Sequence, residues 1–536
     1  MKLFIKTVLC VGMLLIAVSA LAKTRYPKDP VHSPITLTVA NHLKAIVANG
    51  SGQNNNVFMI VGDSLSTGRT DGKNSWFLGQ FEYPYATGNE HSWESVMSLQ
   101  GYEELQPAHA FFLGGVVPHR DPTYPATSPY ARYSLAAKVS MVAGWAITGN
   151  PSPLQREIDA INPKFALVMY GSNDVSAHGG FPGNIDVIIS NILEIVDICI
   201  SQGIVPIITA PHIRYDYDDA SITLQYALRA ACQDRQIPYI NCLKAMMPLP
   251  DHGLGPNHNV HPNPLAWNRA CVFHPEALDY GRNLRNLVTL QSLDRIYQIF
   301  ENNQSFLDEE PPILAGSGTR TDPYIIDETA FVDAGETSAS DHEFYYKLTV
   351  TEPFDMRAMV TDKGNTDIDV ALLDSQFNVL SDGELLVERS VTAGTYYVLI
   401  KNNSGGAARS GRYQLVVMNR DILPQFASFP TTPGNFTASA VSAGSIRLTW
   451  DPATDNKGVK GYKVYRDRRE IAVTTDLIFT DSGLTPATDY TYMVTSYDRA
   501  DNESVRTPLL HVETLAGGGD IPAPPDNLMV IPVSAN

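Results

Sequence analysis

The first half of the chain alternates short apolar runs with longer segments of helical periodicity. Apolar runs rich in β-branched residues are typical of strands buried in a parallel sheet, and the periodic segments between them would cover its faces. The expected strands are residues 58–61, 165–170, 204–209 and 238–241, and the expected helices are residues 185–200, 223–234 and 284–300. Residues 23–310 therefore predict an α/β domain with a mainly parallel sheet. Within it, the Gly-, Tyr- and Pro-rich region 72–133 lacks helical periodicity and predicts long loops around a crevice.

The pattern changes after a first linker at Glu309-Glu310-Pro311-Pro312. Residues 313–420 hold short strands in which apolar and polar positions alternate, for example 343–348 and 394–399, with no helical periodicity. This pattern predicts an all-β sandwich.

A second Pro-containing linker precedes another all-β module at residues 434–514. Trp450 would lie on an early strand of this module and Tyr490 at a corner. The last segment, residues 515–536, begins with a run of glycines and is expected to be a flexible tail or the truncated start of a further module.

The amino terminus predicts export. Lys2 and Lys6 precede an apolar core, and Ala20-Leu21-Ala22 offers a small-x-small cleavage site, so residues 1–22 are typical of a secretory signal peptide. No later segment is long and apolar enough to span a bilayer. The mature protein is expected to be secreted, in an extracellular or periplasmic compartment.

The net charge of the chain excludes some classes of binding partner. The chain has 39 Lys+Arg against 57 Asp+Glu, a formal charge of -18, which argues against nucleic acid and anionic membranes as partners.

Export permits disulfides, and the four cysteines outside the signal allow three full pairings, although Cys199 sits in an apolar run typical of a buried free thiol. Those cysteines are Cys199, Cys232, Cys242 and Cys271. Their spacing matches no zinc pattern, and neither metal nor cofactor is expected.

Three short motifs could carry chemistry. Gly62-Asp63-Ser64 ends the first apolar strand, where a serine would stand at the crevice beyond the sheet, although a helix N-cap explains the same residues. Gly171-Ser172-Asn173-Asp174 follows the second strand and offers a side-chain amide as an oxyanion donor. Val260-His261-Pro262 precedes the last helix and offers the base that a serine nucleophile needs.

These motifs resemble blocks I, III and V of the GDSL, or SGNH, hydrolase family over roughly residues 50–300. The resemblance implies a three-layer, flavodoxin-like α/β domain. It also implies Ser64 as nucleophile, with its own N–H in the oxyanion hole, Asn173 as side-chain oxyanion donor and His261 as base. A block II glycine should supply another N–H. Gly144 is the candidate, with Gly114 and Gly115 as rivals.

The base itself has alternatives. His274, in a second His-Pro pair, is a rival to His261. The family usually places an aspartate three residues before its histidine, and His258 stands there in this chain. Three readings remain: a Ser–His dyad, an orienting carboxylate from Asp251, or a catalytically silent site.

Three further polar residues would line the substrate crevice. Asp63 and Asp174 are expected mainly in turns and hydrogen-bond networks, and His212 follows a strand end. The histidines near His261 show no metal-ligand spacing.

The β-modules carry resemblances of their own. Residues 323–417 resemble a bacterial pre-peptidase C-terminal domain, and residues 434–514 resemble a fibronectin type III module, with Trp450 in the core and Tyr490 as the tyrosine corner.

The sequence thus predicts a secreted serine esterase working through an acyl-Ser64 intermediate, with acyl groups on extracellular polysaccharide as one substrate class. The alternative is an extracellular binding or adhesion protein with a degenerate hydrolase domain. Measurable turnover that disappears in Ser64→Ala distinguishes the two.

Overall fold

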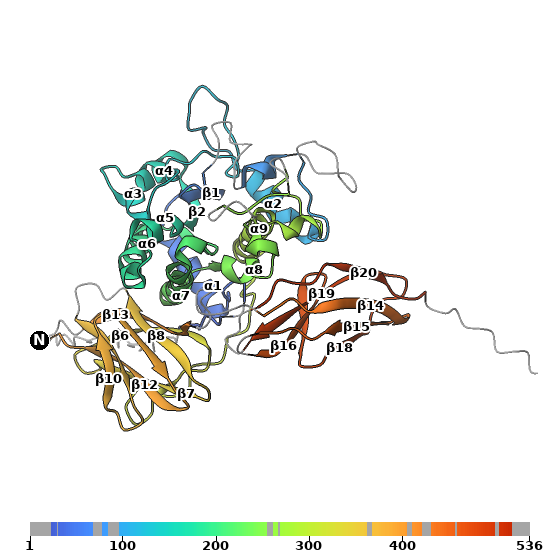
Figure 1. Cartoon of the computed structure of the whole chain (residues 1–536). Helices are drawn as coiled ribbons and strands as arrows, with labels where there is room; N and C mark the ends of the chain where they lie inside the picture. The colour runs from blue at the N-terminus through green and yellow to red at the C-terminus, as the bar shows by residue number, and fades with distance from the viewer. Residues whose placement is uncertain are drawn as a thin grey trace, which may run out of the picture.

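The computed structural model describes most of the chain, and Figure 1 shows an α/β domain with two β-domains packed beside it. The described residues are 23–28, 30–67, 78–83, 96–254, 261–265, 269–361, 367–404, 410–420, 430–455, 458–498 and 503–516. The expected signal peptide lies outside them, as do residues 517–536 of the expected tail.

Four parallel strands form the central sheet of the first domain, in the order β1-β2-β3-β4. They are β1 (Asn54–Gly62), β2 (Pro163–Met169), β3 (Val205–Ala210) and β4 (Tyr239–Asn241). The second half of β1 and all of the other three strands are buried, so the prediction of a buried parallel sheet from the apolar runs is confirmed.

The end of β1 is a topological switch point. Gly62 forms a parallel bridge with Ala137 on one side of β1 and pairs with Met169 of β2 on the other. The chain therefore leaves β1 toward one neighbour and returns on the opposite side. In open α/β sheets the crevice at such a point, beyond the carboxyl ends of the strands, is where ligands bind.

Helices cover the sheet on both sides (Figure 1). Their bounds are α1 (Leu37–Ala48), α2 (Gln106–Leu113), α3 (Ala143–Ile147), α4 (Pro153–Ile161), α5 (Ser172–Ala177), α6 (Ile185–Ser201), α7 (Asp218–Arg235), α8 (Cys242–Met246) and α9 (Gly281–Phe300). The three long helices expected from periodicity are confirmed as α6, α7 and α9.

The prediction of loops throughout residues 72–133 was wrong at α2. This helix is only eight residues long and begins with a proline in its first turn. One of its buried positions is His109, whose ring stacks on Tyr130 in the aromatic core. A polar residue on the buried face hides the apolar periodicity by which a helix is recognised.

The second domain is a sandwich of two sheets, with strand orders β10-β9-β12-β7-β5 and β11-β8-β13-β6. Its strands are β5 (Tyr324–Ile325), β6 (Ala330–Thr337), β7 (Glu343–Val350), β8 (Phe354–Thr361), β9 (Ile368–Leu373), β10 (Val379–Gly383), β11 (Leu386–Val391), β12 (Gly394–Asn402) and β13 (Gly411–Asn419). Apart from the short β5, the pairing is antiparallel. The predicted all-β architecture is confirmed.

The third domain has a three-stranded and a four-stranded antiparallel sheet. Its strands are β14 (Gly434–Ser442), β15 (Ser445–Asp451), β16 (Val459–Arg466), β17 (Arg469–Thr474), β18 (Ile478–Ser482), β19 (Asp489–Asp498) and β20 (Leu510–Glu513). Trp450 is buried in its core, and the hydroxyl of Tyr490 accepts a hydrogen bond from the N–H of Thr485 at 3.0 Å. That bond is the expected tyrosine corner.

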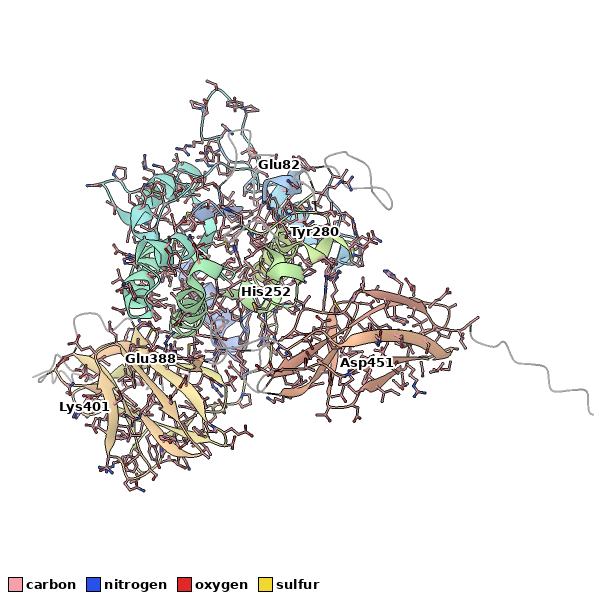
Figure 2. All side chains as sticks on the ribbon, in the orientation of Figure 1. Glu82, His252, Tyr280, Glu388, Lys401 and Asp451 are labelled. Atoms are coloured by element: carbon pink, nitrogen blue, oxygen red, sulfur yellow. The ribbon has the colours of Figure 1, made fainter. Side chains whose placement is uncertain are left out.

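The sandwich is fused to the α/β domain along α7. The guanidinium of Arg357, on β8, binds Asp219 of α7 and also Glu388 of its own sandwich, which Figure 2 labels at this border. Apolar residues of the sandwich, among them Met359 and Met418, extend the hydrophobic core of the first domain. One face of the sandwich is therefore continuous with the core of the first domain, while the interior of the sandwich forms a second core.

All four described cysteines are buried and free, so Cys199 is the buried thiol that the sequence predicts and no disulfide joins the other three. Burial raises the pKa of the Cys199 thiol to about 12. Within the described part of the chain, no helix has the length and apolar character needed to cross a membrane.

Candidate functional site

Ser64 stands in a tight turn directly after β1. The backbone carbonyl of Asp63 accepts hydrogen bonds from Ser66 and Thr67, and its side chain accepts one from the N–H of Leu65 at 2.9 Å. These bonds begin a helical turn at the carboxyl end of the strand, as the sequence predicts. The residues that would continue it lie outside the described part of the chain.

The hydroxyl of Ser64 lies 3.1 Å from Nε2 of His261. The two residues are 197 positions apart, and the fold brings them together at the switch point of the sheet. Both residues are half-buried, so the pair is partly exposed to solvent. This spacing allows proton transfer between hydroxyl and imidazole.

The segment carrying His261 is fastened to the first turn of α9. The N–H of Gly281 donates to Oδ1 of Asn263 at 3.2 Å, and the N–H of Arg282 donates to the carbonyl of Asn263 at 2.9 Å. The Arg282 guanidinium also donates to the carbonyl of Pro262 at 3.2 Å. The histidine is thus held from the residues that follow it.

Asn173 lies in the first turn of α5 and contacts Asp63, the residue before the serine. Its Nδ2 is 3.3 Å from Oδ2 of Asp63 and 3.3 Å from the carbonyl of Met141. The turn before it requires glycine, because Gly171 has φ +126° and a Cβ there would lie 2.5 Å from Leu224. The amide that the sequence singles out therefore faces the region of Ser64.

Asp174 links the end of β2 to the segment that carries Gly144, the candidate for the block II glycine. Its Oδ1 accepts a hydrogen bond from the N–H of Ala143 at 2.8 Å, and its Oδ2 accepts one from Gly171 at 3.0 Å. Gly144 follows Ala143 in the first turn of α3, where backbone N–H groups have no partner within the helix.

The rivals of Gly144 lie elsewhere. A Cβ on Gly115 would be 2.5 Å from the carbonyl of Asn56, and one on Gly114 would also approach the side chain of Asn56. Asn56 is the third residue of β1, so it lies near the end of the strand opposite Ser64. Of the three glycines, Gly144 alone lies in a segment tied to the site.

The three residues expected to line the crevice are instead buried beneath it. The exposed fractions of Asp63, Asp174 and His212 are 1%, 0% and 1%. Burial raises the pKa of Asp63 to about 7, and the nearby Asp174 raises it further while the bond from Leu65 opposes the rise. Burial also raises the pKa of Asp174. Asp63 and Asp174 thus act from inside the fold, through their hydrogen bonds to Leu65, Ala143 and Gly171.

The remaining candidates are His274, His258 and Asp251. Nδ1 of His274 is 3.4 Å from the N–H of Ala277, at the start of the 3-10 turn η6 (Ala277–Asp279), so its ring caps that turn. His258 and the side chain of Asp251 lie outside the described residues.

The sequence reasoning missed the polar residues that anchor the histidine segment. Asn283 accepts a hydrogen bond from Leu265 at 3.1 Å and donates to Arg269 and Val272, while Asn286 donates to Ala270. Their signal is the density of polar residues at buried positions in the first two turns of α9: Arg282, Asn283, Arg285 and Asn286.

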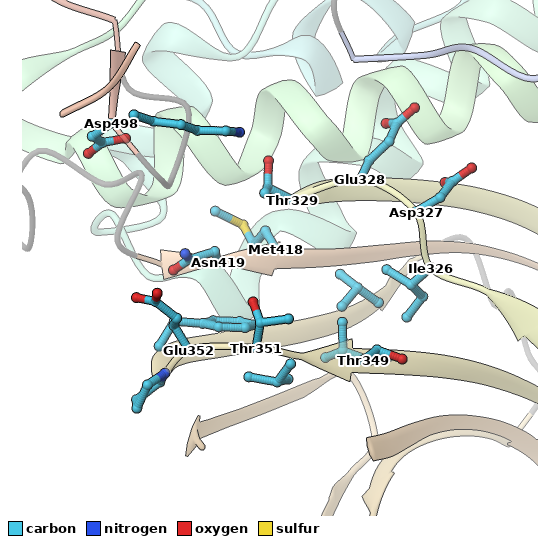
Figure 3. Close-up of a pocket in the computed structure, with 16 residues that line it drawn as sticks. Ile326, Asp327, Glu328, Thr329, Thr349, Thr351, Glu352, Met418, Asn419 and Asp498 are labelled. Atoms are coloured by element: carbon cyan, nitrogen blue, oxygen red, sulfur yellow. The ribbon is translucent and has the colours of Figure 1, made fainter. Parts of the chain in front are cut away.

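A separate cavity of about 570 Å³ opens between the second and third domains (Figure 3). Its wall includes the threonines Thr329, Thr349 and Thr351, and Asp498 contributes from the third domain. None of the candidate catalytic residues lines it, so it is not part of the Ser64 site.

Comparison with known families matches the description "Fibronectin type III domain" to residues 431–509. The third domain is a fibronectin type III domain. The matched span holds the six strands from β14 to β19, the buried Trp450 and the corner made by Tyr490, and β20 follows it directly. The prediction for this module is confirmed.

Relatives that share the fibronectin type III region are polysaccharide-degrading enzymes by name. They include Chitinase 63 of Streptomyces plicatus, 42% identical over 18% of this chain and 16% of that protein. Exoglucanase B of Cellulomonas fimi is 35% identical over 23% of this chain and 11% of that protein. This chain thus covers less than a fifth of the length of either relative.

Two solved structures are also similar to parts of this chain. The FN5 domain of Drosophila Lar is 24% identical and covers 16% of this chain and 99% of that one, with a TM-score of 0.15. The pre-peptidase C-terminal domain of a collagenase from Bacillus anthracis is 18% identical and covers 17% of this chain and 91% of that one, with a TM-score of 0.16.

Proposed function

We propose that this chain is an exported serine hydrolase that cleaves carboxylic esters. The contact of 3.1 Å between Oγ of Ser64 and Nε2 of His261 carries the proposal. A serine hydroxyl is a weak nucleophile until a base within hydrogen-bond reach takes its proton. The resemblance of three motifs to the GDSL/SGNH family supports the same chemistry.

In the proposed reaction His261 takes the proton of Ser64 while Oγ attacks the acyl carbonyl. The oxyanion that forms accepts hydrogen bonds from the N–H of Ser64, the N–H of Gly144 and Nδ2 of Asn173. Collapse of this intermediate breaks the bond to the alcohol oxygen, which takes the proton from the His261 imidazolium. A water molecule, deprotonated by His261, then attacks the acyl-serine. The bond from the acyl carbon to Oγ breaks, Oγ takes the proton back from His261, and the carboxylic acid is released.

The amide of Asn173 is available for this role. Its contacts to Asp63 and Met141 are both 3.3 Å, longer than the 2.9–3.0 Å typical of N–H···O bonds. An oxyanion at normal distance would be a stronger acceptor than the carbonyl of Met141, because it carries charge. The contact to Asp63 would keep the amide oriented meanwhile.

We propose that Ser64 and His261 form the reacting pair of the site. In this account the imidazole of His261 is oriented by the anchoring of Pro262 and Asn263 to α9. Three residues before the histidine, where the GDSL/SGNH family usually has an aspartate, this chain has His258.

For the substrate we propose acyl groups carried by an extracellular polysaccharide. The support is associative: relatives of the fibronectin type III module are named as a chitinase and an exoglucanase. The signal-like residues 1–22 support export.

The test is hydrolysis by the purified mature chain, beginning at Lys23, of p-nitrophenyl acetate, longer acyl esters and acetylated xylan and chitin. We expect turnover that falls at least about 10³-fold in Ser64→Ala. Turnover no greater than that of Ser64→Ala would overturn the proposal. Polysaccharide binding that Ser64→Ala leaves unchanged would then favour the adhesion protein.

A further inference from the structure

The fibronectin type III module contacts the α/β domain next to the residues that hold His261. The guanidinium of Arg468 donates to Oδ1 of Asp279 at 2.9 Å, and Arg506 forms a second ion pair with the same carboxylate. Asp279 is the last residue of η6 and stands two positions before α9 begins. Figure 2 labels Tyr280, between them, on the flank toward this module.

Both arginines are buried in this contact. Their side chains are 11% and 6% exposed. Burial lowers the pKa of Arg468 and of Arg506 to about 10, so both remain charged at neutral pH. A buried cation is costly unless an anion partners it, which makes Asp279 the residue that fixes this interface.

The turn that presents Arg468 is rigid. Asp467 and Arg468 both have positive φ, 48° and 63°, as the central residues of a tight hairpin between β16 and β17 do. The carboxylate of Asp467 accepts hydrogen bonds from the N–H and hydroxyl of Thr491 at 3.0 and 3.1 Å. The N–H of Arg506 also donates to the carbonyl of Pro248 at 3.3 Å. The module is therefore attached to the α/β domain at a second point, which restricts rotation about the first.

A short path leads from Asp279 to the catalytic pair. Tyr280 is the N-cap of α9, and the next two residues, Gly281 and Arg282, hold Asn263 and Pro262. Pro262 follows His261 directly. A shift of η6 therefore moves the first turn of α9 and, with it, the imidazole relative to Ser64.

We propose that the fibronectin type III module positions the catalytic histidine, with Arg468 and Arg506 as positioning residues that act through Asp279. The inference rests on the proposed function of Ser64 and His261. The module is then a part of the active-site scaffold, in addition to any role as a spacer.

The experiment measures inactivation by a fluorophosphonate in the full mature chain, with the maximal rate kinact and the half-saturating concentration KI determined separately. The variants are Asp279→Asn and the pair Arg468→Ala with Arg506→Ala, and the control is Arg447→Ala, an exposed arginine on β15 of the same module. We expect kinact to fall about tenfold or more in the first two, because small misplacements of a base are costly, with KI changed less than threefold. Arg447→Ala should match the wild type.

Counting labelled serines per molecule separates positioning from misfolding. A positioning role lowers the rate per competent site, whereas loss of fold lowers only the number of sites. When Arg506→Ala is combined with Arg468→Lys in place of Arg468→Ala, the charge beside Asp279 is kept. This variant should have a higher kinact than the pair of alanine substitutions.

An unchanged kinact in both Asp279→Asn and the arginine pair, with the wild type labelled normally, would overturn this inference and leave the proposed function intact. A wild type that is not labelled at Ser64 would instead overturn the proposed function.

Discussion

The side-chain amide of Asn173 lies 3.3 Å from the carboxylate of Asp63, and this contact joins the ends of two neighbouring parallel strands. Asp63 follows β1 and Asn173 follows β2. Because the Asp63 carboxylate is buried, it is a fixed acceptor that holds the amide beside the residue before Ser64. The residue before the serine thus sets the geometry of a residue 110 positions later.

If Asn173 donates to the oxyanion, Asn173→Ala should lower kcat about 10²- to 10³-fold with little change in KM, since the bond is strongest in the transition state. Steady-state kinetics on a short acyl ester measure this. Asn184→Ala is the matched control, because that amide donates to the carbonyl of His178, away from Ser64. Equal kcat values for the two variants would contradict the assignment.

The two His-Pro histidines should behave differently. His261→Ala removes the base beside Ser64 and should cost at least about 10³-fold in kcat/KM. His274→Ala removes an imidazole that accepts the N–H of Ala277 and should leave activity within a few-fold, with a loss of about 1 kcal/mol in the free energy of unfolding. The reverse pattern would make His274 the base.

The raised pKa of Asp63, about 7, predicts a specific pH dependence of stability. In the unfolded chain this carboxyl ionises near pH 4, so between about pH 4 and 7 the folded state holds one more proton than the unfolded state. The free energy of unfolding therefore falls as pH rises through this window, by at most about 4 kcal/mol from this group. Below pH 4 the group contributes no pH dependence.

Asp63→Asn should remove that dependence. Urea unfolding of both proteins at several pH values from 4 to 8 measures it, and the variant should gain stability relative to the wild type as pH rises. Parallel curves for the two proteins would show that Asp63 titrates normally.

Arg357 should be essential to the union of the first two domains. Its guanidinium is 1% exposed and binds Asp219 and Glu388, so Arg357→Ala removes the nearer cation of both carboxylates and leaves them Arg420, at 3.9 and 3.2 Å. We expect a loss of about 2 to 4 kcal/mol, below the full cost of a buried pair because the partners are partly exposed. Thermal or urea unfolding measures it. Arg389→Ala, on the exposed side of β11, should cost less than about 0.5 kcal/mol. Equal losses would place the stabilisation elsewhere.

Much of the fold was predictable because burial on both faces leaves a simple pattern. The central strands read as continuous apolar runs, and α6 carries isoleucines at helical spacing along its buried face. The helix α2 was not predictable in this way, because His109 occupies a core position and Pro107 interrupts the pattern at its start. The extent of the interface along α7 was also hidden, since the apolar residues of the sandwich that enter the first core look like ordinary strand residues.

The candidate site was predictable where residues adjoin strand ends. Ser64 and Asn173 each follow an apolar run directly, and the placement of His261 beside Ser64 agrees with the pairing expected from their motifs. The supporting contacts were not predictable, because they depend on long-range packing. The bonds of α9 to Asn263, and of Arg468 to Asp279 across 189 positions, leave no local pattern in the sequence.

The most direct test of the central claim is labelling of the purified mature chain with a fluorophosphonate, followed by peptide mapping. The account predicts one label per molecule, on Ser64, that disappears in Ser64→Ala and is strongly slowed in His261→Ala. Absence of any label on a folded wild-type chain, or a label on another serine, would contradict it.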